Sequence, residues 1–145
     1  MNILITGGYG FIGSTMINFL LNKTKNNIFN IDKINYCSNQ NSIEETLKKL
    51  NTEDKNRYSF KRIDLLNKND LMKAIDEIKP NIIINFAAET HVDRSIANPR
   101  IFLENNTIGT FNLLESSYIY WKGLDSANQK KFKLHHISTD EVYGS

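Results

Sequence analysis

The sequence predicts an α/β fold, a Rossmann-like doubly wound parallel sheet that is truncated after its fifth strand. Two observations lead to this class. Short apolar runs alternate with longer segments whose apolar residues recur every three or four positions, as expected for strands joined by crossover helices. The first apolar run also leads directly into a glycine-rich turn and then a helical segment. The nucleotide-binding version of this sheet has the strand order 3-2-1-4-5.

The first strand, helix and second strand come from residues 2–31. Asn2–Thr6 is the first predicted strand and Ile28–Ile31 the second. Between them lies a helix with apolar residues at helical spacing, namely Ile12, Met16, Phe19 and Leu20. This spacing is typical of a helix.

A short helix and a third strand follow. Ser42–Leu50 has a helical pattern, in which Ser42 and Glu45 have the spacing of a capping box. Tyr58–Ile63 is the third predicted strand.

The next helix has start and stop signals of its own. Asn67 or Asn69 can cap it, and Pro80 ends it because the residue before a proline avoids the helical region. Its expected buried residues are Leu71, Ile75 and Ile78. Ile82–Phe86, which is apolar almost throughout, predicts a central strand buried on both faces.

A long helix begins at Pro99 and ends at Gly123. Residues three or four apart form a stripe along it: Ile101, Asn105, Ile108, Phe111, Leu114, Tyr118 and Trp121. The polar stretch Lys122–Lys131 predicts a surface loop, and Leu134–Ser138 predicts the fifth strand.

Composition narrows the possible function classes. The 145 residues, 40% hydrophobic and 23% charged, fit one soluble domain. The net charge of +2 is spread along the chain, so no nucleic-acid partner is expected. Apolar runs such as Ile82–Ile84 are far shorter than the roughly 20 residues of a membrane span, so we expect a cytoplasmic protein that does not enter a membrane. The single cysteine, Cys37, and the scattered histidines predict no metal site.

The glycine-rich turn and an aspartate predict a dinucleotide site. Gly7, Gly10 and Gly13 have the spacing G-x-x-G-x-x-G between a strand and a helix, where a side chain would hold a pyrophosphate away from the helix N-terminus. The alternative is that the three glycines only form a tight turn between the strand and the helix. Asp32 closes the second strand, where a carboxylate binds both ribose hydroxyls and favours NAD over NADP. The alternative for Asp32 is a solvated loop residue, and the neighbouring Lys33 leaves the choice of cofactor open.

Two further strings resemble a known family. AAETHVDRS at residues 87–95 and HISTDEVYG at residues 136–144, together with the glycine motif, resemble the dTDP-glucose 4,6-dehydratases of the extended short-chain dehydrogenases. In related nucleotide-sugar 4-epimerases, the acidic pair after the threonine is not found. The resemblance runs along the whole chain, and it identifies residues 1–145 as an NAD-binding Rossmann domain that is incomplete and lacks the sugar-nucleotide domain.

The resemblance implies where NAD and the sugar bind. Phe11 and Ile12 would face the pyrophosphate. The remaining cofactor contacts would be Asp32, Lys33, Ile34 and Asn35 at the ribose, Asp64 and Leu65 at the adenine, and Phe86, Ala87, Ala88, Glu89 and Thr90 along the cofactor. Asn105 would also lie beside NAD, at a position where the family usually has threonine. Thr90 and Thr139 would in addition contact the sugar.

The acidic pair would perform the elimination. Such enzymes oxidise the sugar at C4, remove water across C5 and C6, and return the hydride to C6. By resemblance, Glu141 is the base at C5, Asp140 the acid at the C6 hydroxyl, and Thr139 polarises the C4 oxygen. From spacing alone, the alternative remains that Asp140 and Glu141 are an acidic pair that caps a helix after the strand.

The family uses a second catalytic element, for which we expect no match in this sequence. C4 oxidation uses a Tyr-x-x-x-Lys pair that lies downstream of the acidic pair. Tyr118 and Lys122 have this spacing but lie upstream, on the apolar stripe, so we do not expect them to be the base.

Several functions therefore remain open. The chain is the N-terminal part of a dehydratase acting on dTDP-glucose or UDP-glucose, a catalytically inactive NAD-binding module, a self-associating module, or part of a 4-epimerase. The resemblance also implies a homodimer for the parent protein, paired through the long helix after Pro99.

Overall fold

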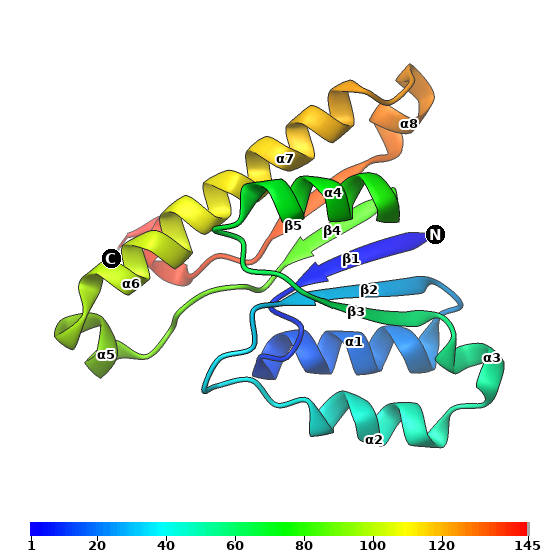
Figure 1. The fold of residues 1–145 in the computed structure, drawn as a ribbon, viewed down its shortest axis with the longest axis horizontal. Helices are drawn as coiled ribbons and strands as arrows, with labels where there is room; N and C mark the ends of the chain where they lie inside the picture. The colour runs from blue at the N-terminus through cyan, green and yellow to red at the C-terminus, as the bar shows by residue number, and fades with distance from the viewer. Residues whose placement is uncertain (145) are drawn as a thin grey trace.

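The sheet has five parallel strands in the order β3-β2-β1-β4-β5, as predicted. The computed structural model describes residues 1–144, and for residues 140 and 141 only the backbone. The strands are β1 (Asn2–Thr6), β2 (Asn27–Asp32), β3 (Tyr58–Arg62), β4 (Ile82–Asn85) and β5 (Lys133–His136). Helices cover both faces of the sheet (Figure 1). The central strand β1 alternates accordingly, with Leu4 in one core and Ile3 and Ile5 in the other.

One face is covered by α1 (Phe11–Lys23) and α2 (Asn41–Lys49), with α3 (Thr52–Lys55) at its edge (Figure 1). The helix predicted here is confirmed, and Met16 and Leu20 of its apolar set pack partly buried against the core. Ile17 and Leu21 are the buried apolar residues, whereas Ile12 and Phe19 are 59% and 56% exposed. Most positions of this helix are apolar, so spacing could not fix its orientation. The close contact of Gly13 with the glycine turn fixes it instead.

The predicted capping box on α2 was also wrong. The helix begins at Asn41, and its N-cap, Gln40, makes no side-chain cap hydrogen bond. Ser42 lies inside the first turn, where its Oγ accepts a hydrogen bond from Asn18 Nδ2 at 3.1 Å. The serine therefore joins α2 to α1 rather than capping its own helix.

The other face is covered by α4 (Lys68–Ile78) and α7 (Thr110–Lys122). The predictions for α4 are confirmed. Asn67 is the N-cap and accepts from the backbone N–H of Asp70, and the helix ends at Lys79 with a left-handed backbone just before Pro80. Its predicted buried residues, Leu71, Ile75 and Ile78, form the centre of the core on this face.

The long helix after Pro99 is continuous but not uniform. A short helix, α5 (Val92–Ala97), precedes it, and α6 (Pro99–Phe102) leads into a π-helix, η1 (Leu103–Gly109), and then α7. Leu113 is buried against the sheet, whereas Phe111 and Tyr118 are 56% and 57% exposed. The predicted apolar stripe is therefore largely on the surface. Gly123 ends the helix, as predicted.

The C-terminal elements differ in detail from the prediction. The stretch predicted as a loop contains a helix, α8 (Ser126–Lys131), because the Asp125 side chain caps it through the backbone N–H groups of Ala127 and Asn128. After β5, a 3-10 turn, η2 (Asp140–Tyr143), follows. No helix in the described part of the chain has the length and apolarity to cross a membrane.

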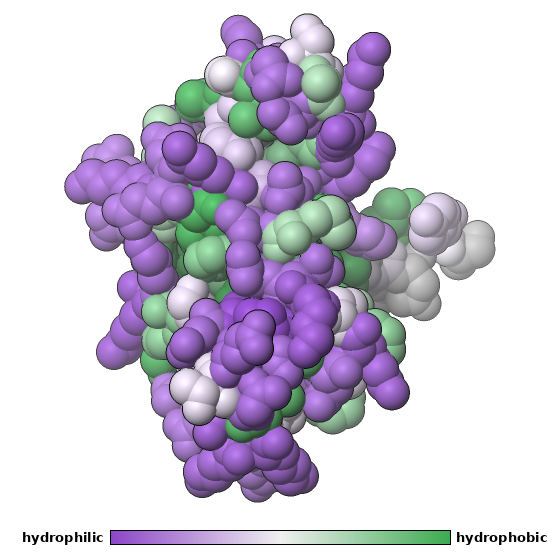
Figure 2. All heavy atoms as spheres, turned by 90° about the vertical axis from the view of Figure 1, so that its right-hand side faces the viewer, coloured by the Kyte–Doolittle hydropathy of each residue, from purple (hydrophilic) through white to green (hydrophobic). Residues whose placement is uncertain are grey.

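The two ends of the sheet differ in character. The strands begin at the side of the molecule that Figure 2 presents, and the surface there is mostly hydrophilic. The strands end on the opposite side, where the loops after each strand converge (Figure 1). In doubly wound sheets, ligands bind at this second end.

Candidate dinucleotide-binding site

A cavity of about 530 Å³ opens at the carboxyl ends of the strands. This size is within the range of small-molecule sites. It is lined by Gly7, Gly10, Phe11, Ile12, Gly13, Ile31, Asp32, Lys33, Asn35, Cys37, Ser38, Ile63, Asp64, Leu65, Phe86, Ala87, Ala88, Glu89, Thr90, Asn105, Ile137, Ser138 and Thr139. Almost all the residues predicted from the sequence therefore meet in one place.

The glycines of the turn have different roles. Gly7 has a positive φ of 71°, and a Cβ there would lie 2.5 Å from Ala87 N. At Gly13 a Cβ would lie 2.3 Å from the Gly7 carbonyl oxygen. At Gly10 the nearest atom to a Cβ would be that same oxygen, at 3.3 Å. The fold itself requires Gly7 and Gly13, whereas at Gly10, which lines the cavity, a Cβ would make one close contact that a small shift can relieve.

Gly8 was missed by the motif and is equally constrained. A Cβ there would lie 2.1 Å from Asn30 Oδ1, on β2 beneath the turn. Asn30 in turn donates from Nδ2 to the Tyr58 hydroxyl at 3.0 Å. Burial raises the pKa of Tyr58, and the neighbouring Tyr9 hydroxyl raises it further. Tyr58 is therefore a neutral structural group beneath the turn.

Asp32 is fixed at the end of β2 by backbone groups. Its side chain is buried, its Oδ2 accepts from the Tyr9 N–H at 3.0 Å, and its Oδ1 accepts from the Ile34 N–H at 2.7 Å. The Ser38 hydroxyl also donates to Oδ1, at 3.4 Å. A carboxylate has about four acceptor positions, so capacity remains for a ribose hydroxyl. Asp32 is thus oriented before any ligand arrives.

Ile34 does not line the cavity. It has a positive φ of 57°, and its side chain packs against the core formed by α1 and α2. It borders a separate shallow groove with Arg62 and Asp64. This backbone conformation directs its N–H to Asp32, and the contact of Ile34 with the cofactor stays a prediction.

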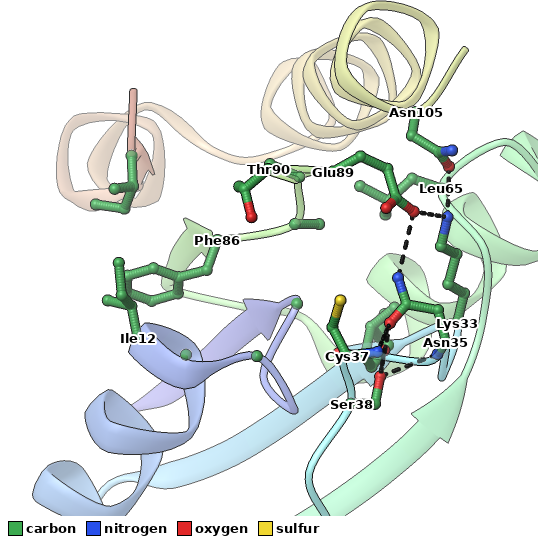
Figure 3. Close-up of a pocket in the computed structure, with 18 of the residues that line it drawn as sticks. Ile12, Lys33, Asn35, Cys37, Ser38, Leu65, Phe86, Glu89, Thr90 and Asn105 are labelled. Carbon is green, nitrogen blue, oxygen red and sulfur yellow. Dashed lines mark hydrogen bonds and ion pairs between the residues drawn. The ribbon is translucent and has the colours of Figure 1, made fainter. Parts of the chain in front are cut away.

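A polar network crosses the cavity between the loops after β2 and β4 (Figure 3). Lys33 Nζ lies 2.8 Å from Glu89 Oε1 and 2.8 Å from Asn105 Oδ1. Asn35 Nδ2 donates to the same Glu89 oxygen at 3.2 Å. The side chain of Glu89 is only 8% exposed, and that of Lys33 is 29% exposed. Lys33 is therefore held by an ion pair that is largely shielded from water.

Asn106 fixes the position of Glu89 and was missed as a site residue. Its Oδ1 accepts from the Glu89 N–H at 2.7 Å, and its Nδ2 donates to the Glu89 carbonyl oxygen at 2.9 Å. Asn105 and Asn106 are neighbours in the π-helix, where Asn105 contacts Lys33 in the loop after β2 and Asn106 contacts Glu89 in the loop after β4. π-Helical turns are frequent at functional sites, but no sequence pattern predicted this one.

A second contact joins the same two loops outside the cavity. The Arg94 guanidinium lies 3.7 Å from the centroid of the Tyr36 ring, and the His91 ring lies beside Tyr36. A hydrogen bond with the Cys37 side chain raises the pKa of the Tyr36 hydroxyl above its usual value. These residues stabilise the edge of the cavity.

The inner end of the cavity is held by Asn85 at the end of β4. Its Oδ1 accepts from Thr6 Oγ1 at 2.5 Å and from the Ala87 N–H at 3.1 Å. Its Nδ2 lies 2.9 Å from His136 Nδ1. Three neighbouring strands are thereby tied together beneath Phe86 and Ala87.

Thr90 and Thr139 both line the cavity, as predicted, at the side of the β4 and β5 loops. The backbone of Asp140 and Glu141 lies in η2, directly after Thr139, and their side chains lie outside the described residues. Tyr118 is exposed on α7, stacked on Trp121, and does not line the cavity. Within the described residues, no cluster of potential metal ligands occurs.

The fold and the residues around the cavity together define a class of protein. A central β1 followed by a glycine turn at a helix N-terminus, with an aspartate at the end of β2, is the arrangement of dinucleotide-binding doubly wound domains. Residues 4–145 match the model of the family described as GDP-mannose 4,6 dehydratase, and the chain belongs to that family.

Among curated relatives, the dTDP-glucose 4,6-dehydratase of Haemophilus influenzae is 43% identical over 144 residues, 99% of this chain and 41% of the relative. The dTDP-glucose 4,6-dehydratase 1 of Escherichia coli K12 is 41% identical, over 99% of this chain and 38% of the relative. The chain therefore spans about two fifths of the length of these relatives.

Solved structures of similar proteins have the same fold over this part of their chains. The dTDP-glucose 4,6-dehydratase of Bacillus anthracis, in complex with NAD, is 36% identical with a TM-score of 0.76, covering 100% of this chain and 39% of that one. The UDP-Glc/GlcNAc 4-epimerase of Campylobacter jejuni is 28% identical with a TM-score of 0.78, covering 98% and 38%.

Proposed function

We propose that this chain is the NAD-binding part of a nucleotide-sugar 4,6-dehydratase. The observation that carries the proposal is the meeting of Gly10, Asp32 and Thr139 around one cavity. These residues come from the end of β2 and from the segments after β1 and β5, and they match the pyrophosphate and ribose of NAD and the sugar of the substrate.

The residues present fit NAD. The first N–H groups of α1 have no acceptor within the helix and are positively polarised, so they can bind a pyrophosphate above Gly10. Asp32 would accept the ribose hydroxyls. Asp64 and Leu65 line the cavity where the adenine is proposed to bind. When bound, NAD would accept a hydride from the sugar and later return it.

The reaction would use groups that follow β4 and β5. Thr90 and Thr139 would orient the sugar, with the Thr139 hydroxyl donating to the C4 oxygen. Glu141 would remove the C5 proton, and Asp140 would protonate the departing C6 hydroxyl. Two neighbouring carboxyl groups in a site that excludes water do not both ionise readily, so an acid and a base can coexist near neutral pH.

The chain by itself is expected to bind rather than to turn over. Among the described residues that line the cavity there is no tyrosine that could serve as the base for C4 oxidation. Binding of NAD is therefore the part of the function that this stretch can be tested for.

The substrate proposed is dTDP-glucose, with UDP-glucose as the alternative. The relatives from Haemophilus influenzae and Escherichia coli are named for dTDP-glucose, and the acidic pair favours a 4,6-dehydratase over a 4-epimerase.

A titration calorimetry experiment with NAD tests the proposal. We expect saturable binding by the 145-residue chain and its loss in Asp32→Ala and Gly10→Val variants. Asp76→Ala, which removes an exposed aspartate of α4, is the matched control and should bind normally. A folded wild-type chain that does not bind NAD would refute the proposal.

Self-association is a second candidate, favoured by the exposed apolar side chains of Phe111, Leu114 and Tyr118 on α7. Such a contiguous surface is typical of an interface, here the proposed homodimer contact of the parent protein. A sedimentation coefficient that rises with concentration, and no longer does so in a Phe111→Ser variant, would support it.

A further inference from the structure

Lys33 stands where a cation would be expected to attract a phosphorylated ribose. It follows Asp32 directly and lines the same cavity. NADP differs from NAD by a 2′-phosphate on that ribose, and proteins that bind NADP commonly place a basic residue nearby. By its position alone, Lys33 would weaken the preference for NAD.

The structure shows that the Lys33 charge is already paired. Its Nζ contacts Glu89 Oε1 and Asn105 Oδ1, both at 2.8 Å (Figure 3). Glu89 is buried, and Asn106 holds its backbone at both the N–H and the carbonyl. Glu89 therefore has little freedom to move away and release the lysine.

The charges at this end of the cavity then sum to a negative value. Asp32 and Glu89 contribute one negative charge each, and Lys33 contributes one positive charge. Asp64, on the neighbouring wall, adds a further negative charge. Arg62, which borders the adjacent groove and donates to the Lys33 carbonyl oxygen, adds one positive charge, so the sum stays negative. A 2′-phosphate would meet net repulsion and would find no free ammonium donor at Lys33.

We propose that Glu89 is a determinant of cofactor specificity, which selects NAD by sequestering Lys33. This inference rests on the proposed dinucleotide-binding function, because it concerns which dinucleotide the same cavity accepts. Asp32 excludes the 2′-phosphate directly, whereas Glu89 does so indirectly by neutralising the neighbouring cation. The two effects are separable by mutation.

The test is the Glu89→Gln variant, which keeps the shape of the side chain and removes its charge. We expect the ratio of Kd for NADP to Kd for NAD to fall about tenfold, since one negative charge near the phosphate disappears and Lys33 is released. The affinity for NAD should change less than about threefold on the same reasoning, because the ribose hydroxyls carry no charge. Both constants are measured by calorimetry.

Two further variants isolate the mechanism. Glu115→Gln removes a carboxylate that pairs with Lys68 on the surface of α7, away from the cavity, and should leave the ratio unchanged. Glu89→Gln combined with Lys33→Met should return the ratio to near its wild-type value, because the released cation is then absent.

Glu89→Asp is a milder variant that retains the charge but withdraws it from Lys33. It should lower the ratio in the same direction by a smaller factor, and it carries the test if Glu89→Gln does not fold by circular dichroism.

The outcomes are distinguishable. If the wild-type chain binds neither nucleotide, the proposed function fails and this inference fails with it. If NAD binds normally but Glu89→Gln and Glu89→Asp leave the ratio unchanged, only the inference is overturned. A gain in NADP binding that persists in the double variant would also overturn it, because Lys33 would then not be responsible.

Discussion

Replacement of Gly10 by serine is expected to separate the stability of this protein from its ability to bind a dinucleotide. Gly10 is the N-cap of α1, with φ −72° and ψ 169°, and this helix has no side-chain cap. The backbone there is extended, so a residue with a side chain fits without strain. Serine is among the preferred N-cap residues and is favoured over glycine by a few tenths of a kcal/mol.

The expected change in the free energy of unfolding follows from the space around Gly10. A Cβ would lie 3.3 Å from the Gly7 carbonyl oxygen, which is close but can be relieved by a small shift. The better cap and the tight contact oppose each other, so the free energy of unfolding should change by less than about 1 kcal/mol. A urea titration followed by circular dichroism measures this.

The affinity for NAD should fall in the Gly10→Ser variant, although its stability hardly changes. The serine hydroxyl would accept from the same helix N–H groups that the pyrophosphate needs, and its Cβ would occupy the cavity floor. Loss of even one hydrogen bond to a charged group costs about 1.5–3 kcal/mol, so NAD affinity should fall by about 10-fold to 100-fold. Calorimetry measures this change.

The control is Gly13→Ala. Its Cβ would lie 2.3 Å from the Gly7 carbonyl oxygen, a collision between backbone segments that no rotamer can relieve. This variant should lose stability and binding together. A folded Gly10→Ser chain that binds NAD as tightly as the wild type would refute the placement of the pyrophosphate at the N-terminus of α1.

Three other predictions concern stability. Asn106→Ala leaves the backbone N–H and carbonyl of the buried residue Glu89 unpaired, so it should lower the free energy of unfolding by about 1–3 kcal/mol in urea titrations. Leu71→Ala, at a fully buried site, should cost about 2–5 kcal/mol, and a cost below 1 kcal/mol would contradict the assigned core. The Lys25 ammonium, together with Arg57, lowers the pKa of Asp54 below its usual 3.8. The stability from Asp54 should therefore be present above pH 4 and be lost as the pH falls through the lowered pKa, so the urea midpoints of wild type and Asp54→Asn should converge in acid.

Much of the fold could be predicted because local signals and tertiary packing agree. Asn67 caps α4 and Pro80 lies just beyond its end, and the strand order follows from the alternation of elements. On α1 these signals were insufficient. With apolar residues around most of the helix, the choice between Phe19 and Ile17 depends on how Gly13 packs on the turn, which the helix pattern does not contain.

The candidate site was predictable where a residue type has one dominant use at one position of the chain. Gly10 and Asp32 are such cases, since Asp32 closes β2 and Gly10 lies in the turn after β1. Gly8 and Asn106 were missed because their roles arise from contacts with residues elsewhere in the chain, and Ser38 was missed because no motif marks its contact with Asp32. Ser38 lines the cavity, and Asn106 acts on a loop seventeen residues away.

The π-helix at Leu103–Gly109 implies that deleting one residue there would have an unusual effect on the structure. An α-helix rotates about 100° per residue, and a π-helix rotates less, so neighbouring side chains stay closer to one side. Deleting a single residue within this turn would allow ordinary helical hydrogen bonding from Pro99 to Lys122. The helix would then be more regular, but Asn105 could no longer reach Lys33 while Asn106 reaches Glu89. The length of this helix is therefore matched to the cavity rather than to its own hydrogen bonding.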